Sequence, residues 1–169
     1  MNRFNTVLAA AALLFLSISC ATADESNEVF NAEYRIEKIK VQLVNGHAES
    51  EAAPGSAARI ITQAIDEAVF GDLDGDGQVE AALFLSQDSG GSGTFFYVAA
   101  AQRSDGRWRG TNAVFIGDRV VPEAIHIGDG VIIVQYLDRR PEDPMSVGPS
   151  VAKTLEIELV GGHLEVLQP

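Results

Sequence analysis

Apolar and polar residues alternate in short segments along this chain, and turn-forming residues separate the segments. Over residues 35–44, isoleucine, valine and leucine at positions 39, 41 and 43 fall on one face, and lysines and glutamine fall on the other. Period-two alternation of this kind predicts a half-buried strand. The pair Asn45-Gly46 follows, which is typical of a hairpin turn. A return strand is expected from His47 onward.

The same reading predicts further strands to the end of the chain. Segment 57–70 fits both a helical stripe and a strand; we favour a strand over 65–70 and leave its start open. The remaining expected strands are 79–87, 94–102, 113–116, 123–127, 131–137, 153–160 and 163–167. Short strands with regular turn signals indicate a mainly β protein. We therefore expect a single antiparallel β domain with at most one short helix.

The amino-terminal segment reads as an export signal over residues 1–19. Arg3 provides a positive start, and an apolar run of about a dozen residues follows, too short for a comfortable membrane span of about 20 residues. Cys20 follows Ser19 in a context that resembles a bacterial lipobox, so lipidation at Cys20 is one reading. Cleavage after Ala23 is the other. Residues 20–33 are expected to be a tether or disordered start, followed by one β-rich domain over 34–169.

The net charge of the chain limits the kinds of partner that it is expected to bind. The chain of 169 residues carries 24 acidic residues against 12 lysines and arginines. This surplus argues against nucleic acid and anionic lipid surfaces, both of which attract basic patches. Cys20 is the only cysteine, so no disulfide is expected. We predict an exported protein, periplasmic or lipid-anchored, that meets the membrane only through an anchor at Cys20 and has an envelope partner of unknown identity.

An acidic, glycine-containing loop is the strongest chemical signal in the sequence. Ca²⁺ takes six to eight oxygen ligands in a flexible shell. Candidate ligands stand at alternate positions: the carboxylates of Asp72, Asp74, Asp76 and Glu80, and the backbone carbonyl of Gln78. An EF-hand would need a glutamate where Leu83 stands and a helix after the loop, so we expect a calcium loop between two strands. The alternative is an acidic turn that binds no metal.

Residues 70–80 resemble the integrin-type FG-GAP calcium hairpin, in which Phe-Gly-Asp-x-Asp/Asn-x-Asp-Gly-x-x-Asp joins two strands. Phe70-Gly71-Asp72 matches its opening, and Glu80 stands in place of the closing aspartate. The hairpin repeats around a propeller in that family, and this chain has one copy, so the resemblance implies only the local hairpin.

A longer resemblance includes the stretch from Gly71 to Gly77 and the run Gly90-Gly91-Ser92-Gly93-Thr94-Phe95-Phe96-Tyr97-Val98-Ala99. It is similar to a family of small exported bacterial proteins, often lipoproteins, of unknown function. That resemblance implies export and one compact domain, and it implies no activity.

A second candidate region is the proline-containing segment 138–149, where Arg139 and Arg140 stand beside carboxylates. Arginine donors on a long loop can bind a peptide terminus or an anionic sugar, although a locally ion-paired loop is the simpler reading. No sequence pattern indicates catalytic residues. We therefore expect a non-enzymatic envelope protein with one structural calcium loop. The alternative is a hydrolase or hydrolase inhibitor that acts on envelope polymers or peptides.

Overall fold

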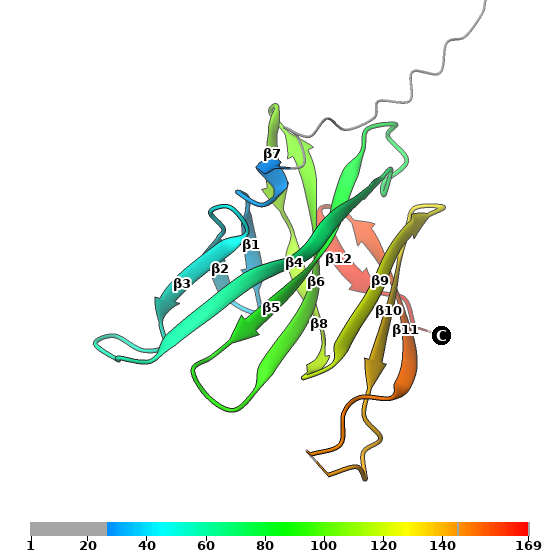
Figure 1. Cartoon of the computed structure of the whole chain (residues 1–169). Coiled ribbons are helices and arrows are strands. Elements are labelled where there is room, and N and C mark those ends of the chain that lie inside the picture. Colours follow the sequence, from blue (N-terminus) through cyan, green and yellow to red (C-terminus); the bar gives the residue numbers. More distant parts are fainter. Residues whose placement is uncertain (1–26, 145, 169) are drawn as a thin grey trace, which may run out of the picture.

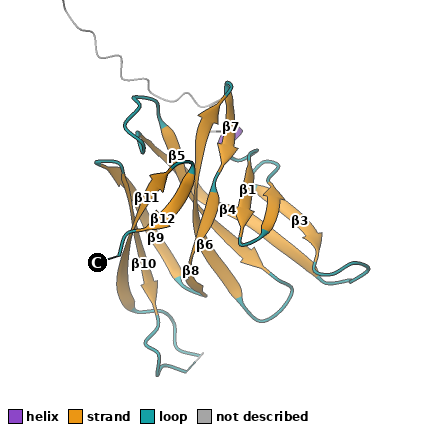
Figure 2. Cartoon of the chain, turned by 180° about the vertical axis from the view of Figure 1, so that it is seen from behind, coloured by secondary structure: helices purple, strands orange, loops and turns teal. Residues whose placement is uncertain are grey.

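The structure is a computed structural model, and it describes residues 27–144 and 146–168. The chain folds almost entirely into strands, with one short helical turn at residues 27–29 (Figure 2). The strands in chain order are β1 Glu33–Ile36, β2 Ile39–Gln42, β3 His47–Glu51, β4 Arg59–Gly71, β5 Glu80–Asp88, β6 Thr94–Ser104, β7 Arg107–Gly110, β8 Asn112–Asp118, β9 Val121–Gly128, β10 Val131–Asp138, β11 Val151–Val160 and β12 His163–Val166. The expectation of a mainly β, antiparallel domain is confirmed.

The strands form two sheets that pack face to face. The larger sheet has the order β2-β1-β8-β6-β5-β4-β3, with β7 paired to β6, and the smaller has the order β12-β11-β10-β9. Figure 1 shows the smaller sheet on one side of the central strands β5 and β6, and β1 to β3 on the other. Nearly all pairings are antiparallel hairpins or meanders; β1 and β8 pair in parallel over two residue pairs.

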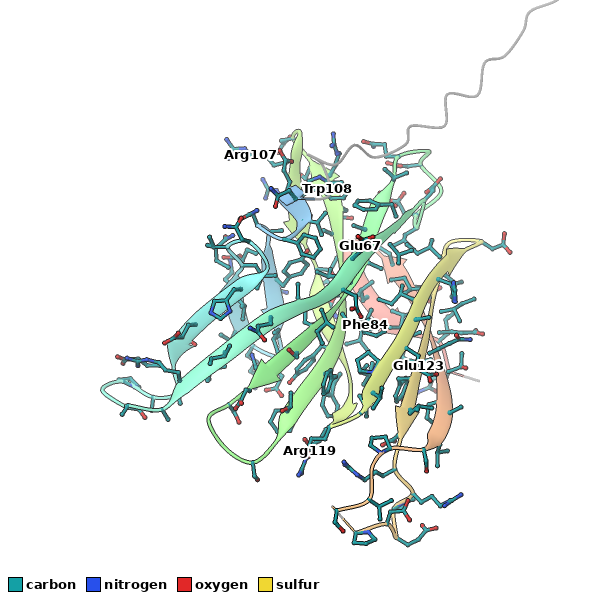
Figure 3. The ribbon with its side chains drawn as sticks, in the orientation of Figure 1. Glu67, Phe84, Arg107, Trp108, Arg119 and Glu123 are labelled. Carbon is teal, nitrogen blue, oxygen red and sulfur yellow. The ribbon has the colours of Figure 1, made fainter. Side chains whose placement is uncertain are left out.

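The central strands are buried on both faces. Phe84 and Val98 belong to the core between the two sheets, where Figure 3 labels Phe84. Leu83 and Tyr97, their neighbours in the chain, belong to a second core on the opposite face of the same strands. A strand covered on both faces has no solvent side to fill with polar residues, which explains the continuous apolar run over residues 81–85.

The larger sheet curls back on itself to enclose the second core. Tyr34 on β1, Ala48 on β3 and Ala64 on β4 all contact this core, although these strands lie toward opposite ends of the sheet order. Residues before β1 also take part: Val29 has no exposed surface, and its carbonyl accepts a hydrogen bond from the Tyr34 hydroxyl at 2.8 Å. The packed domain therefore begins before residue 34.

The single strand expected over residues 35–44 is wrong, because the chain reverses at residues 37–38. Glu37 adopts a left-handed conformation (φ 53°), and β1 and β2 pair across this turn with Ile36 opposite Ile39. A two-residue turn leaves these partners on the same face of the sheet. The alternation of apolar residues shifts by one position at this turn, from Tyr34 and Ile36 to Ile39 and Val41, and the expected strand overlooked this shift.

The ambiguous segment 57–70 is strand from Arg59 onward, as β4. Its register with β5 shifts between Ile65 and Val69, and Asp66 within the shift has a φ of 59°. A bulge of this kind inserts extra residues into one strand. Both faces of β4 carry apolar side chains, because Ile65 and Val69 pack against the core between the sheets and Ala64 and Ala68 pack against the second core. Apolar residues on both faces explain why the segment also resembled a helical stripe.

Candidate metal centre

The acidic segment 72–79 is the loop of the hairpin formed by β4 and β5. Gly71 pairs with Glu80 at the base of the loop, and Gly75 and Gly77 take left-handed conformations (φ 79° and 84°) within it. The expected strand on each side of the loop is thus present. Figure 1 places the loop at the same end of the molecule as the β9–β10 turn.

Three of the predicted ligand residues converge. Carboxylate oxygens of Asp72, Asp74 and Glu80 lie within 4.8 Å of one another. Asp72 and Asp74 are exposed, whereas Glu80 is only 2 % exposed. The Leu73 N–H donates a hydrogen bond to Glu80 Oε2 at 2.7 Å. The group therefore has two carboxylates that face solvent and one that is enclosed by protein.

The enclosed carboxylate lies in an unfavourable environment for a negative charge. Burial raises the pKa of Glu80, and the nearby charges of Asp74, Asp76 and Asp72 raise it further, while the hydrogen bond from Leu73 opposes them. Among the described residues, no lysine or arginine forms an ion pair with these four carboxylates. A bound cation would offset this repulsion directly.

Backbone amides hold the exposed carboxylates in place. Asp72 accepts hydrogen bonds from the N–H groups of Gly75 (2.7 Å) and Gly77 (3.1 Å). Asp74 accepts one from the N–H of Asp76 at 3.1 Å. The loop is therefore already folded around its acidic side chains before any ligand is considered, which lowers the cost of ordering it for a cation.

The remaining two predicted ligand residues, Asp76 and Gln78, are hydrogen-bonded to each other. The carboxylate of Asp76 accepts hydrogen bonds from the backbone N–H of Gln78 (2.7 Å) and from its side-chain amide (2.8 Å). Asp76 does not belong to the converging group. Asp72 also accepts two hydrogen bonds and does belong to the group, so the position of the Asp76 carboxylate, and not its hydrogen bonds, sets it apart.

Leu73 connects the acidic loop to the core between the sheets. Its side chain is 3 % exposed and packs in that core, between two aspartates whose side chains are exposed. Its carbonyl lies close to Gly130 of the β9–β10 turn, where an added Cβ would stand 3.4 Å from the oxygen. The sequence analysis missed this role; the signal available was one leucine inside an otherwise polar loop.

The second candidate region is the loop between β10 and β11, at the end of the molecule away from the acidic loop (Figure 1). Arg139 Nε donates a hydrogen bond to the Val147 carbonyl at 2.6 Å, so this side chain closes the loop on itself. The backbone N–H of Arg140 donates to Asp143, and the Arg140 side chain is exposed. The structure therefore gives Arg139 a local structural contact and leaves Arg140 at the surface.

The fold and the site together define a two-sheet β protein with a preformed acidic loop in one hairpin. Comparisons of the chain with family models, curated proteins and solved structures found no match. In the described part of the chain, no helix is long and apolar enough to cross a membrane. The export features at Cys20 and Ala23 lie outside the described residues.

Proposed function

We propose that this protein is an exported cell-envelope protein whose β4–β5 loop binds Ca²⁺ at a structural site. The observation that carries the proposal is the convergence of Asp72, Asp74 and Glu80, with Glu80 buried and without a basic partner among the described residues. An ionised carboxylate in such a place needs a compensating charge or a proton.

The donor set favours calcium over other ions. All three converging groups are carboxylates, which are hard oxygen ligands, and no softer histidine or cysteine ligand belongs to the group. Backbone carbonyls and water can complete the shell. Ca²⁺ accepts irregular geometry of this kind, whereas Mg²⁺ requires a near-ideal octahedron.

The structural role follows from the position of Leu73. An ion held by Asp72, Asp74 and Glu80 would fix the backbone on both sides of a side chain that is buried between the sheets. Calcium would therefore stabilise the contact between the acidic loop and the smaller sheet. Export supports this role, because sites in extracellular modules have dissociation constants of about 10⁻⁴ to 10⁻³ M and depend on external calcium.

Thermal unfolding with calcium and with chelator tests the proposal. At a calcium concentration about ten times the dissociation constant, binding to the folded state stabilises it by about 1.4 kcal/mol. For a domain of this size, we expect the melting temperature to rise by about 3–6 °C. Asp74→Ala should abolish the calcium-dependent rise, whatever its effect on the melting temperature in chelator.

Asp129→Asn is the matched control. It removes one negative charge from the neighbouring β9–β10 turn, and asparagine tolerates the left-handed conformation that Asp129 adopts (φ 52°). This variant should keep the full calcium-dependent rise. A wild-type protein that unfolds at the same temperature with and without calcium, or an Asp74→Ala variant that keeps the rise, contradicts the proposal.

A further inference from the structure

We propose that the seam between β2 and β3 binds an extended, uncharged peptide segment of another protein by strand addition. The inference does not depend on the calcium site, which lies in the β4–β5 loop. It rests on the way the larger sheet curls, on the cleft that the curling leaves, and on the directions of the backbone groups along the two strands.

The larger sheet stops just short of closing on itself. Its order begins with β2 and ends with β3, so each of these strands has one neighbour in the sheet. They meet only at their connecting turn, through an isolated bridge between Val44 and His47. Both hydrogen bonds of the bridge are formed, at 2.8 and 3.1 Å. Beyond the bridge the two strands diverge, and the ladder does not continue.

A cleft of about 250 Å³ occupies the gap between the diverging strands. It is lined by consecutive residues of both strands, 39–42 on β2 and 48–50 on β3, and by Ile60, Thr62 and Gln87. Successive side chains of a strand point to opposite faces. A cleft that touches four consecutive residues is therefore bordered by the backbone edge of the strand itself.

The register shows which backbone groups face the cleft. A two-residue turn makes Ile36 and Ile39 a hydrogen-bonded pair, so the N–H and C=O of Lys40 point away from β1. On β3, Ala52 N–H donates to Ala58 and Ala64 N–H donates to Gly46. The even positions of β3 thus pair with β4, and the backbone groups of Glu49 point away from β4, toward β2. These are the groups that an added strand requires.

The side chains at the seam indicate an apolar residue at the inward-facing position of the peptide. Ile39 is 55 % exposed, and it lines the cleft with Val41, Ala48 and Ile60. At the base, Gln87 Nε2 donates a hydrogen bond to Thr62 Oγ1 at 3.2 Å. The volume lies below the range of about 300–1,000 Å³ that is usual for drug-sized ligands. A single aliphatic side chain with its backbone suits this space better than a large small molecule.

The charges around the seam are already paired within the chain. Lys40 forms an ion pair with Glu33 at 2.8 Å, and Arg59 pairs with Glu49 at 3.2 Å and with Glu51 at 3.4 Å. A charged peptide would have to compete with these pairs or meet a like charge. The seam is therefore complementary to an uncharged segment, which gains affinity from backbone hydrogen bonds and from its one buried side chain.

The test uses the full chain and a labelled, capped hexapeptide of alternating threonine and valine, with fluorescence anisotropy as the readout. Two further peptides of the same sequence carry N-methyl groups on alternate amides, one on the odd-numbered amides and one on the even-numbered amides. Each therefore lacks the N–H groups along one of its two edges. We expect the first peptide to bind and the N-methylated peptides to bind at least tenfold more weakly.

Two variants and one control locate the binding to the seam. Lys40→Pro removes the N–H that faces the cleft, and proline is tolerated on an edge strand; Ala48→Phe fills the cleft from β3. Each should weaken binding at least tenfold. Lys40→Ala loses the same ion pair with Glu33 but keeps the N–H, and it should bind within twofold of the wild type. If Lys40→Pro does not fold, Ala48→Phe and the N-methylated peptides still test whether the peptide binds at the seam by strand addition.

Several outcomes would overturn the inference. One is that the hexapeptide does not bind at millimolar concentration. Another is that the N-methylated peptides bind as tightly as the unmodified peptide. Binding that survives both Lys40→Pro and Ala48→Phe places the peptide elsewhere on the surface. A chain that self-associates in sedimentation, loses this association in Lys40→Pro and ignores the peptide would show that the occupant is a second copy.

Discussion

Glu80 and Asp118 show how the surroundings of one carboxylate decide its electrostatics. Glu80 is 2 % exposed, and burial is the main cause of its raised pKa. Asp118 is partly exposed and accepts hydrogen bonds from Arg119, the shortest at 2.7 Å, and this contact lowers its pKa. The surroundings of Glu80 therefore disfavour its ionised form in the folded state, and the surroundings of Asp118 favour the ionised form.

The Asp118–Arg119 pair makes a prediction about pH. Because the pKa of Asp118 is lowered in the folded state, its contribution to stability is present above the ordinary value of 3.8 and is lost as the pH falls through the folded-state pKa. We expect a carbon-detected NMR titration to give Asp118 a pKa below 3.8, and Arg119→Gln to return it toward that value. A pKa at or above 3.8 in the wild type would contradict the assignment of the Arg119 contact.

At the scale of the elements, the end of strand β4 determines how closely the two sheets approach each other. β4 ends at Gly71, which lies against Ile127 of β9, and a Cβ added at Gly71 would stand 2.5 Å from Ile127 Cγ2. The acidic loop begins at the next residue. The close packing of the Ile127 side chain against the Gly71 backbone therefore positions both the loop and the smaller sheet, and it requires glycine for space rather than for backbone freedom.

Gly71→Ala should destabilise the fold through this contact. Overpacking of this kind typically costs about 1–3 kcal/mol, which urea denaturation can measure. Gly128→Ala is the matched control, because it lies on the same neighbouring strand, β9, and an added Cβ there meets nothing within 4 Å. We expect the control to change stability by less than about 0.5 kcal/mol. Equal effects of the two substitutions would show that Ile127 does not restrict this position.

At the scale of the whole molecule, the two cores share their central strands, and one side chain joins the two sheets. Asn112 on β8 donates to the Leu164 carbonyl at 3.0 Å, and its own carbonyl oxygen accepts from the Leu164 N–H at 2.8 Å. The amide side chain therefore reproduces the pairing of a neighbouring strand. It connects the larger sheet to β12, the edge strand of the smaller one.

Removal of this connection should loosen the edge of the smaller sheet. Asn112→Ala leaves the backbone N–H and C=O of Leu164 without their partner, and we expect a loss of about 1–3 kcal/mol in the free energy of unfolding. Hydrogen exchange at the Leu164 amide should quicken more than exchange at Ile132 in the core. Equal acceleration at both amides would indicate global destabilisation and no specific role at the edge.

The candidate site was partly predictable from the sequence, because its ligand residues are close along the chain. Alternate carboxylates with intervening glycines are a local pattern, so segment 72–80 could be identified as a loop between strands without any tertiary information. The convergence of Asp72, Asp74 and Glu80 without Asp76 depends on side-chain directions within the folded loop. The anchoring of the loop by Leu73 depends on the position of the second sheet.

The sequence alone determined the β class and most strand positions, because alternation with period two and turn residues act over a few residues. Pairing between strands that are not neighbours in the chain was decided only by tertiary structure. The parallel pairing of β1 with β8 joins residues far apart in the chain. The seam between β2 and β3 has the same origin, since it exists only where the two ends of one curled sheet meet.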